Sequence, residues 1–276
     1  MIFDATCCKL GEGPLWHPER NELFWFDILG KTLLTKRDKH QFNEHVSAAG
    51  WIDSDTLLIA SETALLRYDT NSRTQEILHP LEADNKITRS NDGRADPWGG
   101  FWIGTMGKNA EPDAGAIYRY FQGELRQLFA PITIPNAICF SPNRQYGYFT
   151  DTSNPIIWRQ KLHEKDGWPT GYPENFIDFN GTGINPDGAV IDADGNFWNA
   201  QWGAARVAQY SASGAFLQSF DLPTSQITCP AFGGDTLQTL FVTSATQGLR
   251  PKQPDAGKTF ALQTETTGQK EHQIAL

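Results

Sequence analysis

The chain has 276 residues, 12% of them aromatic, with 25 glycines and 16 prolines. Its formal net charge is −9 and no basic patch stands out. Because phosphate binding draws on clustered Lys and Arg, nucleic acid is excluded as an expected partner. No run approaches the roughly 18 apolar residues of a membrane helix, and residues 1–6 lack the features of a signal peptide. We therefore expect a cytoplasmic protein that does not bind membranes.

A short unit recurs six times along the chain. In each copy a polar residue opens a short apolar strand, a turn follows, and a second strand ends in small polar residues. Buried anchors are expected in the second strands at Trp25, Leu58, Trp102, Tyr148, Trp198 and Phe241. These anchors lie about 33 to 50 residues apart, which is the period of a four-stranded propeller blade.

Each unit is expected to continue into two further strands. Third strands are predicted at 32–35, 64–68, 115–120, 156–159, 206–210 and 259–262, and outer strands at 45–47, 76–78, 125–129, 176–179 and 216–220. The sixth unit lacks an outer strand, whereas residues 2–7 form a strand that precedes the first unit. We therefore predict an all-β, six-bladed β-propeller, with residues 1–276 as one domain and the ring closed by the N-terminal strand in the last blade.

The innermost strand of each blade lines the central channel, so the residues at its entrance converge from different units. Two carboxylates and two amides occur at these positions, and such oxygen donors suit a hard divalent cation such as calcium, magnesium or manganese, with zinc as a further possibility. The entrance residues are Glu12, Gly50, Asn91, Asn136, Asp187 and Thr228 or Cys229.

Each of these residues also has a simpler interpretation. Glu12 alone would be an exposed loop acid, and Asn136 and Asp187 both follow Pro, where Asn and Asp commonly form turns. Their shared position in the repeated unit favours a ligand role instead. Trp202, after the second strand of the fifth unit, is either a core residue or an aromatic platform for a sugar ring.

Other metal patterns are absent. The four cysteines show no Cys-x-x-Cys spacing and the six histidines form no His-x-His or His-x-x-x-His pair, which argues against a zinc site of either kind. Residues 192–196 begin like a calcium-binding loop, but the twelfth position holds Gly203 in place of Glu, so a hairpin turn is expected.

Five motifs occur in an order that resembles the senescence-marker-protein/gluconolactonase (regucalcin-like) family. They are Gly-Glu-Gly-Pro-Leu-Trp at 11–16, Arg-Ser-Asn-Asp-Gly at 89–93 with Gly-Thr-Met at 104–106, Pro-Asn-Ala at 135–137 with Phe-Ser-Pro at 140–142, Pro-Asp-Gly at 186–188 with Asp-Gly at 194–195, and Cys-Pro-Ala-Phe-Gly-Gly at 229–234. The resemblance covers essentially the whole chain. It implies a six-bladed propeller that hydrolyses sugar lactones with one divalent metal ion.

The same resemblance implies roles for individual residues. It implies that Glu12, Asn136 and Asp187 hold the metal and that Arg89 and Asn91 contact the substrate. Some relatives carry an acid shortly after the Gly-Thr-Met motif, where this chain has Asn109. Either Asn109 or Glu111, two residues further on, is therefore expected to contact the substrate.

Lactone hydrolysis requires delivery of water and stabilisation of a developing oxyanion. A cation with three protein ligands keeps coordination positions open for both tasks. Asp187 is the candidate general base as well as a ligand, and Arg89 and Asn91 are expected to orient the sugar. Two alternatives remain: a calcium-binding propeller without enzymatic activity, and a metal-dependent esterase or phosphotriesterase on the same scaffold.

Overall fold

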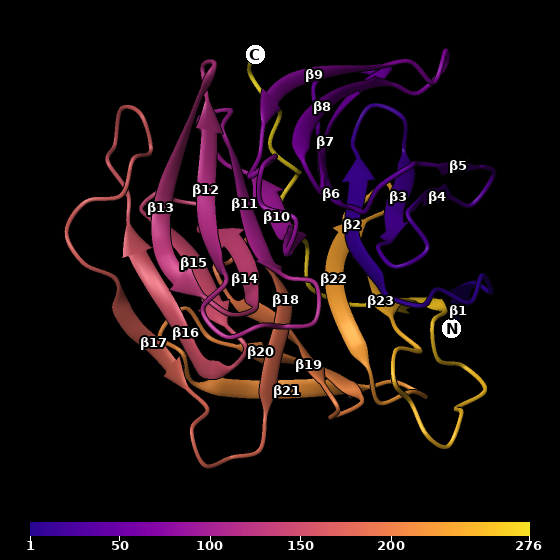
Figure 1. Cartoon of the computed structure of the whole chain (residues 1–276). Coiled ribbons are helices and arrows are strands. Elements are labelled where there is room, and N and C mark those ends of the chain that lie inside the picture. The colour runs from indigo at the N-terminus through magenta and orange to yellow at the C-terminus, as the bar shows by residue number, and fades with distance from the viewer.

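The structure, a computed structural model, describes residues 1–276. It consists of twenty-four strands in six antiparallel four-stranded sheets, which are arranged in a ring (Figure 1). We call the axis of this ring, lined by the innermost strands, the channel. The prediction of an all-β, six-bladed propeller is confirmed. The chain contains no helix that is long and apolar enough to cross a membrane.

The two inner strands of each blade are almost entirely buried. The innermost strands are β2 (Gly11–His17), β6 (Val46–Trp51), β10 (Thr88–Ala95), β14 (Pro135–Phe140), β18 (Asn185–Ile191) and β22 (Ile227–Gly233). The second strands are β3 (Glu22–Asp27), β7 (Thr56–Ser61), β11 (Phe101–Gly107), β15 (Tyr146–Asp151), β19 (Phe197–Trp202) and β23 (Thr239–Ser244). Neighbouring innermost strands contact one another around the ring, from β2 through to β22 and back to β2.

The two outer strands of each blade are more exposed. The third strands are β4 (Thr32–Thr35), β8 (Ala64–Asp69), β12 (Gly115–Phe121), β16 (Asn154–Lys161), β20 (Arg206–Tyr210) and β24 (Thr259–Gln263). The outermost strands are β5 (Lys39–Gln41), β9 (Gln75–Pro80), β13 (Glu124–Ile132), β17 (Glu174–Asp178), β21 (Phe216–Asp221) and β1 (Ile2–Asp4).

Aromatic side chains fill the wedges between neighbouring blades. Trp102 packs edge-on against Phe140 of the next blade, with ring centroids 5.3 Å apart, and Trp198 packs in the same way against Phe232. All six predicted anchors are buried, which explains why a large side chain recurs at this position. Edge-to-face pairs add to the burial of apolar area, so each wedge stabilises the contact between two blades.

The last blade is built from both ends of the chain, as predicted. β1 pairs with β24, so that Ile2 lies opposite Phe260, and the backbone groups of Met1 and Ala261 bond to each other. The strand is shorter than residues 2–7: after Asp4 the pairing with β24 ends, and Thr6 N donates to Asp4 Oδ1 instead. Phe3 lies in the wedge between the first and last blades, where its ring centroid is 4.8 Å from that of Phe241.

The predicted outer strand at 45–47 is wrong. The outermost strand of the first blade is β5, and Val46 and Ser47 instead begin the innermost strand of the second blade, where both are fully buried. The Lys-His-Gln sequence of β5 contains no apolar residue, whereas residues 45–47 contain the apolar Val46. The local pattern therefore favoured an outer strand at 45–47, but Val46 and Ser47 are buried beside the channel in an innermost strand.

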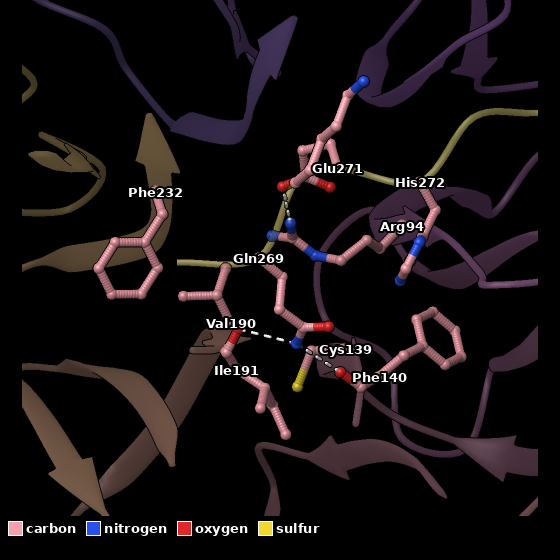
Figure 2. Close-up of a pocket in the computed structure, with 10 residues that line it drawn as sticks. Arg94, Cys139, Phe140, Val190, Ile191, Phe232, Gln269, Glu271 and His272 are labelled. Carbon is pink, nitrogen blue, oxygen red and sulfur yellow. Dashed lines mark hydrogen bonds and ion pairs between the residues drawn. The ribbon is translucent and has the colours of Figure 1, made fainter. Parts of the chain in front are cut away.

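The last thirteen residues form a C-terminal segment, 264–276, that crosses the far end of the channel. Its backbone bonds to the last blade at Leu237, to the fifth at Ala193, to the second at Trp51 and to the third at Gly99. Gln269 reaches the fourth blade, where its Nε2 donates to Phe140 O at 3.0 Å (Figure 2). The cavity left at this end is about 30 Å³, enough for no more than a few water molecules.

Candidate active site

Every innermost strand has an irregularity in its pairing with the second strand of the same blade, at or next to a candidate site position in most blades. The pairing with the second strand shifts register after Glu12, Ser90, Asn136, Pro186 and Ile227, and after Val46 in the second blade. A β-bulge re-aims the side chain that it contains. Gly13 and Ala137, which follow Glu12 and Asn136, have φ values of 54° and 58°, in the left-handed region.

Gly50 is not at the entrance, and Thr228 does not line the cavity. Gly50 lies at the far end, where an added Cβ would meet the side chain of Ile274, and Ser47 occupies the equivalent position in β6. Thr228 is fully buried and donates to Gly11 O at 2.6 Å, so it joins the last blade to the first. The error at Gly50 follows from the misassigned strand at 45–47.

Cys229 is buried beside the site but does not line its cavity. An added Cβ on Gly188 would lie 2.4 Å from the Cys229 sulfur, so the glycine permits the close approach of the two strands. Burial raises the pKa of the Cys229 thiol well above its ordinary value, which keeps the sulfur protonated. A protonated thiol is a poor metal ligand.

The remaining candidate residues converge on one open cavity of about 660 Å³. The residues that line it include Glu12, Arg89, Asn91, Asn109, Asn136 and Asp187. They come from four different blades and all except Asn109 are buried. The structure thus brings together every predicted metal ligand and every predicted substrate contact except the alternative, Glu111.

Glu12 and Asp187 present one carboxylate oxygen each to this cavity. The other oxygen accepts a bond from the following backbone N–H, at 3.0 Å from Gly13 and 3.1 Å from Gly188. Burial raises the pKa of both carboxyls, and the negative charge of Asp92 raises both further. The negative charge of Glu12 also raises the pKa of Asp187.

The amide of Asn136 has its orientation fixed by Thr152. Thr152 Oγ1 donates its proton to Pro186 O at 2.7 Å, so it must accept the bond from Asn136 Nδ2 at 2.9 Å. The Asn136 carbonyl oxygen therefore faces the channel. There it accepts one bond from Asn91 Nδ2 at 3.2 Å, which leaves its second lone pair available.

These three residues fit a divalent cation. Two buried carboxylates that repel each other, next to an oriented amide oxygen, form an oxygen-only donor set in which a cation would offset the cost of burial. No group of three His, Cys, Asp or Glu side chains forms a metal site elsewhere in the protein. Glu12, Asn136 and Asp187 are thus the residues that could hold a metal, with an amide as the third donor.

Arg89 and Asn91 form a chain of bonds on the floor of the cavity. Arg89 Nη1 donates to Asn91 Oδ1 at 2.8 Å, and Asn91 Nδ2 donates to Pro135 O at 2.9 Å. Both ends of the Asn91 amide are therefore engaged within the protein. Burial lowers the pKa of Arg89 to about 10, so the guanidinium remains charged at neutral pH.

Asn109 lies at the exposed rim, and Glu111 holds it there. The carboxylate of Glu111 accepts bonds from the backbone N–H of Asn109 at 3.0 Å and from its Nδ2 at 2.9 Å. Glu111 itself does not line the cavity, whereas half-buried Trp202 does. The substrate contact predicted for Asn109 stays a prediction, and Glu111 is the residue that fixes the position of the Asn109 side chain.

Sequence reasoning missed three residues that shape the site. Thr152 orients Asn136, and Asn199 Nδ2 donates to the carbonyl oxygens of Asp187 and Gly188 at 3.0 and 3.2 Å. Lys108 lines the rim and forms an ion pair with Glu62. Thr152 follows the second strand β15, so the small polar residues at the ends of second strands were the available signal for it, whereas Asn199 lies inside β19.

Comparisons with known proteins agree with this arrangement. The family described as the SMP-30/Gluconolactonase/LRE-like region matches residues 10–246. A Rhizobium meliloti protein, provisionally named a sugar lactone lactonase, is 41% identical over 96% of this chain and 94% of its own length. A 6-deoxy-6-sulfogluconolactonase from Pseudomonas putida is 33% identical over 94% of this chain and 92% of its own length.

A solved structure gives the same result. The crystal structure of a calcium-binding protein, regucalcin, from Agrobacterium tumefaciens is 39% identical to this chain, with a TM-score of 0.96. The match covers 100% of this chain and 97% of the other. The resemblance detected in the motifs is confirmed: this chain belongs to the SMP-30/gluconolactonase/LRE-like family.

Proposed function

We propose that the protein hydrolyses a sugar lactone to the aldonic acid with one divalent cation held by Glu12, Asn136 and Asp187. The observation that carries the proposal is the placement of two buried carboxylates, an oriented amide and a charged Arg89 on the floor of one open cavity. The names of the two relatives, a provisional sugar lactone lactonase and a sulfogluconolactonase, support the substrate class.

When bound, the cation would supply Lewis-acid chemistry, because it polarises a carbonyl oxygen and acidifies water. The chain supplies the other groups. Asp187 accepts a proton from the water that attacks the lactone carbonyl, and returns it to the ring oxygen when the carbon–oxygen bond breaks. Arg89 projects its guanidinium toward the cavity, where it orients the hydroxyl groups and carbonyl oxygen of the sugar.

The polar lining of the cavity also suits a sugar. Amide and hydroxyl side chains line its wall, including Ser153 and Asn185, and Trp202 provides an aromatic face on which a sugar ring can stack. Acidic residues lie only at the floor, and the rim carries Lys108 and Asn109. Trp202, which packs against the hydrophobic core and also lines the cavity, is thus a candidate for sugar binding.

A panel of aldonolactones, aryl esters and phosphotriesters tests this function, with each substrate assayed before and after exhaustive chelation. We expect hydrolysis of at least one aldonolactone, its loss on chelation, and its recovery when a divalent cation is restored. Preferred hydrolysis of aryl esters or phosphotriesters would identify the esterase alternative. Cation binding without hydrolysis of any substrate would identify a calcium-binding protein, as the name of the solved relative suggests.

A further inference from the structure

The strands β10 and β14 carry Asn91 and Asn136 but belong to different sheets. No backbone ladder therefore fixes one against the other. Side chains of β10 hold β14 instead: Asp92 Oδ2 accepts from Ile138 N at 2.7 Å, and Arg94 Nε donates to Ile138 O at 3.3 Å. Both polar backbone groups of Ile138 are thus held by the neighbouring blade.

Ile138 is connected to the site through one strained residue. Ala137 separates Ile138 from Asn136 and has a φ of 58°, which costs a residue with a side chain of the order of 1 kcal/mol or more. Such a conformation persists only where the surroundings hold it. The bonds from Asp92 and Arg94 to Ile138 are therefore part of what keeps the Asn136 amide directed into the channel.

The C-terminal segment supplies the partner of Arg94. Figure 2 shows Glu271 beside the Arg94 guanidinium, with which it forms an ion pair that is nearly buried. The Glu271 backbone is fixed in turn, because its carbonyl oxygen accepts a bond from Trp51 Nε1 at 3.0 Å. Gln269 anchors the same segment to the fourth and fifth blades, through Phe140 O and Ile191 O.

We propose that Glu271 is a positioning residue for the cation site at the opposite end of the channel, an inference that rests on the proposed function. Glu271 forms the ion pair with Arg94, so the carboxylate of Asp92 remains free to accept the bond from Ile138 N. That bond in turn helps to keep Asn136 in place. Without Glu271, the Arg94 guanidinium becomes an unpaired charge in a closed space, which is strongly unfavourable. Asp92 is the carboxylate that then remains within reach of Arg94, and pairing with it would release Ile138 N.

The test uses the full chain and calcium as the probe. Calcium affinity is measured by titration against a fluorescent chelator for the parent, Glu271→Ala, Arg94→Met and the Glu271→Ala/Arg94→Met double variant. We expect Glu271→Ala to weaken calcium binding about 10-fold, within the range of remote coupling. The double variant should bind no more weakly than Arg94→Met alone, because the effect of Glu271 passes through Arg94.

Two further variants serve as controls. Glu265→Gln removes a negative charge from an exposed position of the same segment and should leave calcium affinity unchanged. Glu271→Gln keeps an oxygen acceptor for Arg94, so it should retain part of the affinity and serves if Glu271→Ala fails to fold. Melting curves confirm that each variant is folded at the assay temperature.

The outcomes separate this inference from the proposed function. A parent that binds no divalent cation overturns both. A parent that binds calcium, with a Glu271→Ala variant that melts earlier but binds equally well, overturns only the positioning role. Additive losses from Glu271→Ala and Arg94→Met would also overturn it, because they would show that the two side chains act independently.

Discussion

Asp187 and Asn136 both offer an oxygen donor to a cation, but only Asp187 can accept a proton near neutral pH. Substitution of each therefore separates metal binding from base catalysis. Asp187→Asn should keep part of the metal affinity and lose turnover by about 10² or more at saturating metal. Asn136→Ala should bind metal more weakly, with activity that excess metal recovers. The measurements are kcat on an aldonolactone and metal affinity.

A rate for metal-loaded Asp187→Asn within a factor of about three of the parent would contradict the role of Asp187 as base, since that difference is worth under ~1 kcal/mol. The Asn136→Ala variant is the matched control, because it removes a ligand of the same cavity but no titratable group.

The raised pKa values of the buried carboxyls predict how the metal-free protein responds to pH. Burial, followed by the charge of Asp92, raises the pKa of Glu12 from 4.5 to about 8. Between these values the folded state holds a proton that the unfolded state has released, so the free energy of unfolding falls as pH rises. Chelated protein should therefore melt several degrees lower at pH 8 than at pH 5.

Calcium should remove this pH dependence, because a bound cation stabilises the ionised carboxylates. Glu12→Gln should reduce it without added metal, since it removes one of the titrating groups. Melting temperatures of chelated parent and variant at the two pH values provide the measurement. An equal fall in both proteins would show that other groups cause it.

At this scale the sequence predicted Glu12, Asn136 and Asp187 as candidate metal ligands because they share one position in the repeat, even though each has an ordinary explanation. It failed where roles depend on side-chain bonds across blades. The engagement of Asn91 between Arg89 and Asn136, and the orientation of Asn136 by Thr152, depend on distances that no spacing encodes.

At the scale of the elements, removal of β1 tests whether this strand closes the ring. This strand pairs with β24. The ring centroid of Phe3 lies 6.2 Å from that of Trp25 and 4.8 Å from that of Phe241, in the wedge between the first and last blades. Deletion of residues 1–5 exposes the edge of β24 and empties this wedge. We expect the melting temperature to fall by roughly 5 °C or more, since the loss of a large aromatic contact costs about 3 kcal/mol.

Phe3→Ala is the matched variant, because it empties the wedge but keeps the backbone pairing, and its loss should be smaller. Differential scanning calorimetry of the three proteins measures both effects. A deletion variant that melts at the parent temperature would show that β1 does not stabilise the ring.

Strand positions were predictable to within a few residues wherever an aromatic anchor marks the second strand. They failed between the first two units, where a polar edge strand, β5, precedes a channel strand of small residues, β6. Neither strand carries a large apolar side chain at its start, so the local pattern could not separate them.

On the scale of the whole molecule, the ring and its closure followed from six repeats and one unpaired strand. The C-terminal segment did not, because residues 264–276 are mostly polar and have no periodicity. Its path is set by single bonds to several blades, such as that from Ile274 N to Trp51 O at 2.8 Å. Such contacts appear only once the blades are in place.

The sealed far end has a kinetic consequence. With Gln269 and Glu271 across the channel and only about 30 Å³ left beside them, no sugar can pass through the ring. Lactone and aldonic acid must therefore enter and leave through the same opening of the cavity, one after the other. The acid that has just formed obstructs the next lactone, so accumulated product should raise the apparent KM and leave kcat unchanged, and the enzyme should slow as its own reaction proceeds.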